Sequence, residues 1–185
     1  MRVIAGTSRG RRLTAFEGKN VRPTPDRVRE ALFSILQSHL ENFSDLRVLD
    51  LFAGSGALAI EALSRGAASA CLVEKDRASE KIIRSNLAYC QMTDRSSLII
   101  KDAMQALSAF GEESFDLVFL DPPYALGLAE QALNEISNRK ILSRDGILCA
   151  ETGAKEVLPE RVVKLQRIKQ RRYGSIMLNF YAYEQ

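Results

Sequence analysis

The amino-acid sequence predicts an α/β fold, in which a mostly parallel sheet carries helices on both faces and ends in an antiparallel hairpin. Through most of the chain, apolar runs alternate with helical stretches, which is typical of strands joined by crossover helices. The runs 46–52 and 115–120 show little polar alternation, as expected for central strands buried on both sides. By contrast, residues 161–169 and 174–183 do alternate and flank Gly174, which predicts the hairpin.

The expected elements follow one another in order along the chain. Apolar runs predict strands at 46–52, 70–74, 97–100, 115–120 and 146–150. Periodic apolar positions predict helices at about 57–65, 77–91, 103–109 and 126–138. Upstream, residues 2–5 and 11–16 predict two short strands around the turn Ser8-Arg9-Gly10. A further helix is expected to begin at Thr24 or Pro25, with apolar side chains at Val28, Ala31, Leu32, Ile35 and Leu36.

Three parts of the chain follow from this order of elements. A length of 185 residues suits one domain with a small appendage. We expect a basic β-hairpin appendage over 1–22, a linking helix over 23–43, and a catalytic domain over 44–185. Because no segment reads as a secretory signal or as an apolar span of roughly 18 residues, the expected location is cytoplasmic, with no membrane partner.

The cysteine and histidine content argues against a metal or disulfide framework. Cys71, Cys90 and Cys149 are far apart and show no Cys-x-x-Cys spacing, which favours buried apolar roles in a reducing compartment. The single histidine, His39, is expected on a helix surface. With one histidine, neither a histidine-based metal site nor a Ser-His-Asp triad is expected, and no metal is assigned.

Basic residues gather at the two ends of the chain. Residues 1–29 hold eight basic and two acidic residues, and residues 161–172 hold six basic and no acidic ones. Since the whole chain has a net charge of +3, the remainder is acidic. Guanidinium groups suit phosphate recognition, so these clusters indicate either a polyanionic partner or a solvated charged surface. The arginines assigned to a nucleic-acid substrate are Arg9, Arg11, Arg12 and Arg22.

A glycine-rich turn follows the first long strand, in Asp50-Leu51-Phe52-Ala53-Gly54-Ser55-Gly56. Glycines let the backbone approach a ligand closely at the carboxyl edge of a parallel sheet. Asp50 can receive a cationic amino group, and Glu74, at the end of the next strand, can accept both hydroxyls of a ribose. Asp102 follows the third strand, where an adenine amino group would lie. The expected cofactor site comprises Asp50, Phe52, Gly54, Gly56, Glu74, Lys75, Asp102 and Ala103.

A nicotinamide enzyme is the rival interpretation of this turn. Gly54, Gly56 and Ala59 fit the dinucleotide-binding fingerprint, and Glu74 lies 20 residues beyond Gly54. However, the glycines come late after Asp50, and nothing in the sequence resembles an acid–base pair for hydride transfer.

The most informative segment is Asp121-Pro122-Pro123-Tyr124, which directly follows an apolar strand. The prolines stiffen the loop and remove backbone donors, which leaves the Asp121 carboxylate and the Pro122 carbonyl as acceptors. Tyr124 adds a flat stacking surface. This combination suits a planar ring that carries an NH2 group, so Asp121, Pro122 and Tyr124 are the expected catalytic residues, with Pro123 and Tyr124 contacting the target base.

Two acceptors on the two hydrogens of such an amine would favour a pyramidal nitrogen and aim its lone pair at a methyl donor. They would also stabilise the positive charge that the nitrogen gains as the bond forms. Tyr124 would stack on a base that is unpaired or flipped out. The residue after the prolines is not cysteine, which disfavours methylation of a pyrimidine carbon through a thiolate.

Taken together, the glycine turn and the Asp-Pro-Pro-Tyr segment resemble the class I S-adenosylmethionine (SAM)-dependent methyltransferases that modify amino groups. The segments 2–13, with the letters RVIAGTSRGRRL, and 22–33, with RPTPDRVREALF, are similar to those of the bacterial 16S rRNA (guanine-N2)-methyltransferase family. Arg172-Tyr173-Gly174 also fits, so the resemblance covers nearly the whole chain.

This resemblance implies a seven-stranded sheet, SAM as methyl donor, and N2-methylguanosine in 16S rRNA as product. It also implies an assembled or late-assembling small ribosomal subunit as partner, whereas a monomer is simply the default expectation for the chain. N6-adenine methylation of DNA, methylation of a protein glutamine and a non-catalytic RNA-binding module remain the alternatives. The exact nucleotide, the assembly state of the substrate and the order of SAM and RNA binding stay open.

Overall fold

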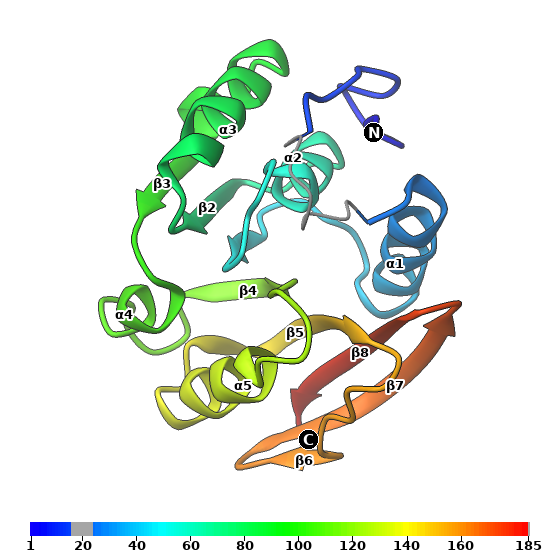
Figure 1. Ribbon diagram of the computed structural model, residues 1–185, viewed down its shortest axis with the longest axis vertical. Helices are drawn as coiled ribbons and strands as arrows, with labels where there is room; N and C mark the ends of the chain where they lie inside the picture. Colours follow the sequence, from blue (N-terminus) through cyan, green and yellow to red (C-terminus); the bar gives the residue numbers. More distant parts are fainter. Residues whose placement is uncertain (16–23, 185) are drawn as a thin grey trace.

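A single mixed sheet organises the protein, and the computed structural model describes residues 1–15 and 24–184. Over these residues the sheet has eight strands in the order β3-β2-β1-β4-β5-β8-β7-β6 (Figure 1). The strands are β1 (Arg47–Asp50), β2 (Ser69–Glu74), β3 (Ser96–Ile100), β4 (Phe115–Leu120), β5 (Leu142–Gly153), β6 (Arg161–Val162), β7 (Leu165–Tyr173) and β8 (Ile176–Tyr183). The first five are parallel, and the last three join the sheet antiparallel.

The helices cover both faces of this sheet, as expected. They are α1 (Asp26–His39), α2 (Ala57–Ser64), α3 (Arg77–Tyr89), α4 (Ala103–Leu107) and α5 (Leu128–Asn138), with a short 3-10 helix at Thr93–Arg95. Side chains of α1, α2 and α3 belong to one buried core, and those of α4 and α5 belong to a second core on the other face. Each core is lined by alternate residues of the central strands, because successive side chains of a strand point to opposite faces.

The predicted fold class is confirmed, with one strand more than the seven implied by the resemblance. The C-terminal hairpin is formed by β7 and β8, and Gly174 in its turn has a φ of 61°. The addition is β6, only two residues long, which pairs with the start of β7. The alternating run that begins at residue 161 is therefore interrupted between β6 and β7.

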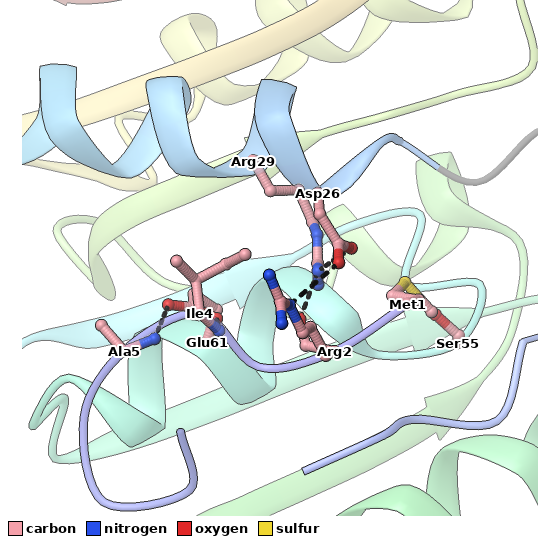
Figure 2. A network of polar contacts seen from close by, with 8 residues as sticks. All are labelled: Met1, Arg2, Ile4, Ala5, Asp26, Arg29, Ser55 and Glu61. Carbon is pink, nitrogen blue, oxygen red and sulfur yellow. Dashed lines mark hydrogen bonds and ion pairs between the residues drawn. The ribbon is translucent and has the colours of Figure 1, made fainter. Parts of the chain in front are cut away.

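The N-terminal segment forms less regular pairing than expected. Instead of two strands, residues 1–15 contain one isolated antiparallel bridge, between Arg2 and Arg12. Glu61 of α2, a fully buried carboxylate, accepts the backbone N–H groups of Ile4 at 2.7 Å and Ala5 at 3.0 Å (Figure 2). Contacts with α2 therefore replace part of the hydrogen bonding that a regular hairpin would provide, and the segment lies against that helix.

Gly6 shows how closely this segment approaches α2. Its φ is +80°, and a Cβ atom placed on it would lie 1.8 Å from the carbonyl oxygen of Ser64. The neighbouring Thr7 N–H donates to that same oxygen at 2.9 Å. Only a residue without a side chain fits at this position.

The remaining expectations for the N-terminal region are met in part. Helix α1 begins at Asp26, with Pro25 as its N-cap, and ends at His39, whose side chain is exposed. The expected boundary between appendage and linking helix, at residues 22 and 23, lies outside the described residues. Among those described, no helix combines the length and apolar character needed to cross a membrane. The three cysteines are free and buried, as the sequence predicts.

Candidate functional site

A cavity of about 410 Å³ opens at the carboxyl ends of the parallel strands. It is bounded by the turn after β1, the end of β2, the start of α4 and the loop after β4. The N-terminal segment and the start of α1 contribute Met1, Ala15, Thr24 and Arg29 to its wall. This edge of an α/β sheet is where ligands bind in such folds.

The glycine turn adopts a backbone that side chains disfavour. Gly54 has a φ of 56° and Gly56 a φ of 78°, both in the left-handed region. Gly56 is the N-cap of α2, and a Cβ atom there would approach the Leu72 side chain to 3.1 Å. At Gly54 no atom of the described residues lies within 4 Å of the corresponding position. The turn therefore needs glycine at both positions, and at Gly54 it leaves the backbone open to the cavity that this residue lines.

Asp50 ends β1 and lies buried in the cavity wall, with 1% of its surface exposed. Its Oδ2 accepts the backbone N–H of Ala59 at 3.2 Å, whereas Oδ1 is buried and has no hydrogen-bond partner in the described part of the chain. Burial raises the pKa of Asp50 to about 7, and the amides of Ala59 and Phe52 oppose that rise. A cationic donor beside Oδ1 would supply the missing hydrogen bond and would also balance the negative charge of the ionised carboxylate.

Glu74 and Asp102 occupy the ends of the next two strands. Glu74 accepts the N–H of Gly54 on Oε2 at 2.9 Å and that of Asp76 on Oε1 at 2.8 Å. Asp102 is the N-cap of α4, and its Oδ1 accepts the N–H of Met104 at 2.9 Å. Both carboxylates line the cavity. They hold the surrounding loops in place in addition to any ligand that they contact.

The Asp-Pro-Pro-Tyr segment faces the same cavity from the end of β4. The Thr24 hydroxyl lies 3.3 Å from Asp121 Oδ2 and 3.0 Å from Glu151 Oε2. The Tyr124 hydroxyl donates to Glu151 Oε1 at 2.7 Å. The ring of Tyr124 packs on the backbone at Gly153, where a Cβ atom would lie 3.3 Å from it.

Two carboxyl groups, those of Asp121 just after β4 and Glu151 within β5, thus lie close together, on either side of the Thr24 hydroxyl. Removal from water raises the pKa of Asp121 well above its usual value, and the charges of Glu151 and Asp50 raise it further. Burial also raises the pKa of Glu151, against hydrogen bonds from Tyr124 and Thr24 that lower it. Both groups consequently hold protons more strongly than ordinary carboxylates.

Arg29 is the most deeply buried cation of the site, with 1% of its surface exposed. Its Nη2 donates to Asp26 Oδ1 at 2.8 Å and to the carbonyl oxygen of Arg2 (Figure 2). Its Nε and Nη1 are buried and have no hydrogen-bond partner among residues 1–15 and 24–184. An anionic ligand group within reach of these two donors would give each of them a hydrogen-bond acceptor.

Most of the predicted site residues are brought together by the fold. The cavity is lined by Asp50, Phe52, Gly54, Glu74, Lys75, Asp102, Ala103, Asp121, Pro122, Pro123 and Tyr124. Gly56 shapes the turn rather than the wall. Arg9, Arg11 and Arg12 do not line the cavity; the turn that carries Arg9 docks on Ser64, at the opposite end of α2. Arg22 lies outside the described residues.

Arg11 has a structural contact that the sequence did not indicate. Its guanidinium lies 5.4 Å from the ring centre of Tyr89 and donates to the carbonyl oxygen of the same residue. Only part of its surface is exposed, whereas Arg9 and Arg12 are exposed.

Sequence reasoning missed Thr24, Arg29 and Glu151. Thr24 and Arg29 belong to an upstream segment whose place beside the sheet edge depends on tertiary packing. Glu151 ends the run of apolar residues 147–150, and a carboxylate after a buried strand is the same signal that indicated Glu74.

Comparisons with known proteins agree with this geometry. A family model described as "Conserved hypothetical protein 95" matches residues 1–182. "Putative rRNA methyltransferase YlbH" of Bacillus subtilis is 39% identical over 176 residues, which cover 94% of each chain. "Ribosomal RNA small subunit methyltransferase D" of Escherichia coli K12 is 38% identical over 159 residues, covering 86% of this chain and 78% of the relative.

The fold is also shared with a solved structure. "Putative methyltransferase yhhF from Escherichia coli" superposes with a TM-score of 0.86 at 34% identity, covering 100% of this chain and 98% of the other. The match spans the N-terminal segment as well as the sheet. The chain therefore belongs to the family described as Conserved hypothetical protein 95, and its sheet has the class I methyltransferase fold.

Proposed function

We propose that this protein transfers a methyl group from SAM to the exocyclic N2 amine of a guanine in the 16S rRNA of the small ribosomal subunit. The observation that carries the proposal is the shared cavity: the glycine turn and Asp121-Pro122-Pro123-Tyr124 line the same space. The names of the relatives in B. subtilis and E. coli support rRNA as the substrate class. Guanine as the base follows from the resemblance of the N-terminal motifs.

The unsatisfied groups of the cavity fit SAM. Its amino-acid end is a zwitterion. Asp50 and Arg29 line the cavity, and they carry a buried carboxylate oxygen and two buried guanidinium donors that no described residue pairs. The carboxylate of Glu74 suits the ribose hydroxyls, and the start of α4 at Asp102 suits the adenine. Polar groups of the right charge are therefore available for each part of the molecule.

SAM supplies a methyl group that its sulfonium already makes electrophilic. The protein therefore has only to position the target amine and to stabilise the transition state. Asp121 and the Pro122 carbonyl accept the two hydrogens of the target amine and orient its lone pair. As positive charge develops on nitrogen, the same two acceptors stabilise it. Tyr124, 39% exposed, presents its ring to the incoming base.

The partner in this proposal is an assembled or late-assembling small subunit, bound by a cytoplasmic monomer. Exposed arginines at both ends of the chain provide the charge for phosphate contacts, including Arg9 and Arg12 near the N-terminus and Arg171 and Arg172 on β7. Adenine in DNA, a protein glutamine and a non-catalytic RNA-binding role are the alternatives that the experiment must separate.

A methyl-transfer assay with labelled SAM tests the proposal. Small subunits from a strain that lacks this enzyme, naked 16S rRNA, DNA and protein extract are offered in parallel, and the products are digested to nucleosides or amino acids. The expected result is label in N2-methylguanosine from one rRNA site. Label in adenine, DNA or glutamine would contradict the proposed substrate. The absence of label, together with the absence of SAM binding in calorimetry, would contradict the proposal that the protein is a methyltransferase.

The Asp121→Ala variant serves as a matched control. It removes an acceptor for the amine but leaves the cofactor loops intact, so it should bind SAM normally and transfer almost no label. Near-normal transfer by this variant would remove Asp121 from the mechanism.

A further inference from the structure

Two adjacent strands bring two carboxyl groups together beside the target-base side of the cavity. Leu120 at the end of β4 is in register with Ala150 of β5, so the next residues along, Asp121 just after β4 and Glu151 within β5, lie side by side. The Thr24 hydroxyl lies 3.3 Å from Asp121 Oδ2 and within 3.2 Å of both oxygens of Glu151. One hydroxyl group thus lies between the two carboxyl groups.

That arrangement contains fewer protons than acceptors. A threonine hydroxyl donates one hydrogen bond, so it can satisfy only one of the two carboxyl groups at a time. Two carboxylates that share a site resist simultaneous ionisation, so the first proton is bound more strongly than by an isolated group. The raised pKa values of Asp121 and Glu151 agree with this expectation.

Glu151 is not among the residues that line the cavity, and 2% of its surface is exposed. It acts instead through its neighbours: Tyr124 donates its hydroxyl proton to Oε1 at 2.7 Å, and Thr24 contacts both oxygens. Tyr124 and Thr24 do line the cavity. Glu151 is therefore the common anchor of the Tyr124 side chain and of Thr24, which precedes α1.

We propose that Glu151 is a positioning residue of the target-base site, which shares a proton with Asp121 through Thr24 and holds Tyr124 in place for stacking. This inference rests on the proposed amine methylation and adds to it a destination for the released proton.

The proton balance of the reaction gives the pair a role. As the bond between nitrogen and the methyl carbon forms, the bond between that carbon and sulfur breaks, and sulfur keeps the electron pair. The methylated nitrogen is then cationic and must lose one proton. Asp121 accepts that proton, and the Thr24 hydroxyl offers a path from Asp121 to Glu151, since it lies within hydrogen-bond distance of both.

Several other groups act on the ionisation of this pair. Asp50 on β1 raises the pKa of Asp121 by its charge, and the hydrogen bond from Thr24 lowers it. The Cys149 thiol on β5 adds no negative charge near neutral pH, since burial and the two carboxylates raise its own pKa well above the usual value. Arg29 on α1 lines the same cavity, as do Lys75 and Lys101 after β2 and β3.

Two substitutions with opposite expected effects test the proposal. Single-turnover methyl transfer to small subunits is measured from pH 5 to 9 with saturating SAM. Glu151→Gln keeps an oxygen for Tyr124 but removes the charge that raises the pKa of Asp121, so the acidic limb of the profile should move down by at least about one pH unit. Thr24→Val removes the hydroxyl that lowers the pKa, so the limb should move up. Thr24→Ser, which keeps the hydroxyl, is the matched control.

A second readout does not depend on activity. In ¹³C-carboxyl NMR of the whole protein, the wild type should show two coupled titrations above the usual carboxylate range, and Glu151→Gln should leave one, at lower pH. If Glu151→Gln does not fold, the upward shift in Thr24→Val decides the question.

The possible failures can be distinguished. If the profiles of Glu151→Gln and Thr24→Val superimpose on that of the wild type, Glu151 has no part in the proton balance and the inference is wrong. If the wild type transfers no label at any pH, the proposed function fails and the inference fails with it. A merely structural role for Glu151 would lower the rate at all pH values without moving the limb.

Discussion

The backbone N–H of Gly54 donates a hydrogen bond to Glu74 Oε2 at 2.9 Å and thereby joins the turn after β1 to the end of β2. The same carboxylate accepts Asp76 N–H on its other oxygen. Glu74 therefore holds two cofactor loops at once, in addition to the ribose contact proposed for it. A substitution to alanine therefore removes the loop support and the proposed ribose contact together.

Replacing Glu74 with Ala should raise the dissociation constant of SAM by about ten- to a hundredfold, because two loop hydrogen bonds and a ligand contact are lost. Calorimetry with SAM measures the effect. Glu80→Ala, which removes an exposed carboxylate paired with Arg84 on α3, is the control and should leave the constant unchanged. An unchanged constant in Glu74→Ala would show that the ribose binds elsewhere.

The affinity for SAM should depend on pH through Asp50. Its pKa is about 7 in the free protein, and a bound ammonium group favours the ionised form. Below pH 7, binding must release the proton, so the dissociation constant at pH 6 should be roughly tenfold higher than at pH 8. In calorimetry at pH 6, the binding enthalpy should vary with the ionisation enthalpy of the buffer. In Asp50→Asn both effects should vanish, and their persistence there would exclude Asp50 as the source.

Arg29 should recognise the amino-acid end of SAM. In Arg29→Met, which keeps the length of the side chain but not its donors, the dissociation constant of S-adenosylhomocysteine should rise at least about tenfold. Methylthioadenosine, which lacks the carboxylate and the ammonium group, is the matched ligand and should bind equally to both proteins. Equal losses for the two ligands would point to a general disturbance of the fold, and circular dichroism and the melting temperature of the variant check for one.

Gly6→Ala should destabilise the protein far more than Gly10→Ala. Both glycines have a φ near +80°, but a Cβ at Gly6 would lie 1.8 Å from the Ser64 carbonyl oxygen, and at Gly10 the space is empty. Gly10→Ala should cost about 1 kcal/mol, which is roughly 3 °C in melting temperature, and Gly6→Ala several times more. Thermal unfolding measures both. Similar losses would mean that the N-terminal segment is not docked on α2 in solution.

The two clusters of arginines should differ in their effect on catalysis. Arg171 and Arg172 are exposed near the β7–β8 turn, which joins β5 through the hydrogen bond from Ala154 N–H to the Ser175 carbonyl oxygen. Arg161 and Arg167, further along the same cluster, are paired with Glu184 and Glu160. Arg171 and Arg172 donate to backbone carbonyls and have no acidic partner among the described residues, and they lie at the edge of the sheet that carries the cavity.

Charge reversal of Arg171 and Arg172 together should weaken RNA binding and lower the slope of log affinity against log salt by up to about 0.8 for each lost phosphate contact. Charge reversal of Arg9 and Arg12 should lower kcat/KM less than charge reversal of Arg171 and Arg172 does. The turn that carries Arg9 lies at the end of α2 that is far from the cavity. Filter binding over a salt series and initial rates measure both. Arg144→Glu, at the opposite edge near the start of β5, is the control. An unchanged slope in the first variant would show that β7 does not contact RNA.

The parts of the site that could be predicted are those indicated by short stretches of neighbouring residues. Asp50 and Glu74 end their strands and Asp102 comes shortly after β3. Parallel strands bring their carboxyl ends to one edge of the sheet, so all three side chains line the same cavity. The prolines after Asp121 likewise predict a rigid loop. Each of these signals needs only the neighbouring residues to be recognised.

The parts that could not be predicted depend on contacts between distant segments. Thr24 lies 127 residues from Glu151 in the chain, and no periodicity indicates that contact. The alternation in residues 2–5 predicts a strand, yet Glu61 of α2 takes hydrogen bonds that a neighbouring strand would otherwise make. Tertiary contacts outweighed local propensity in both cases.

The three buried thiols provide internal reporters of how the molecule opens. Cys90 and Cys149 belong to the core beneath α1, α2 and α3, and Cys71 belongs to the core beneath α4 and α5. Burial raises the pKa of each thiol and also keeps reagents away from it. Alkylating reagents should therefore react with a cysteine only when the helices that cover it move away from the sheet. In a chain without tryptophan, the labelling rate of each cysteine would time the opening of one face independently of the other.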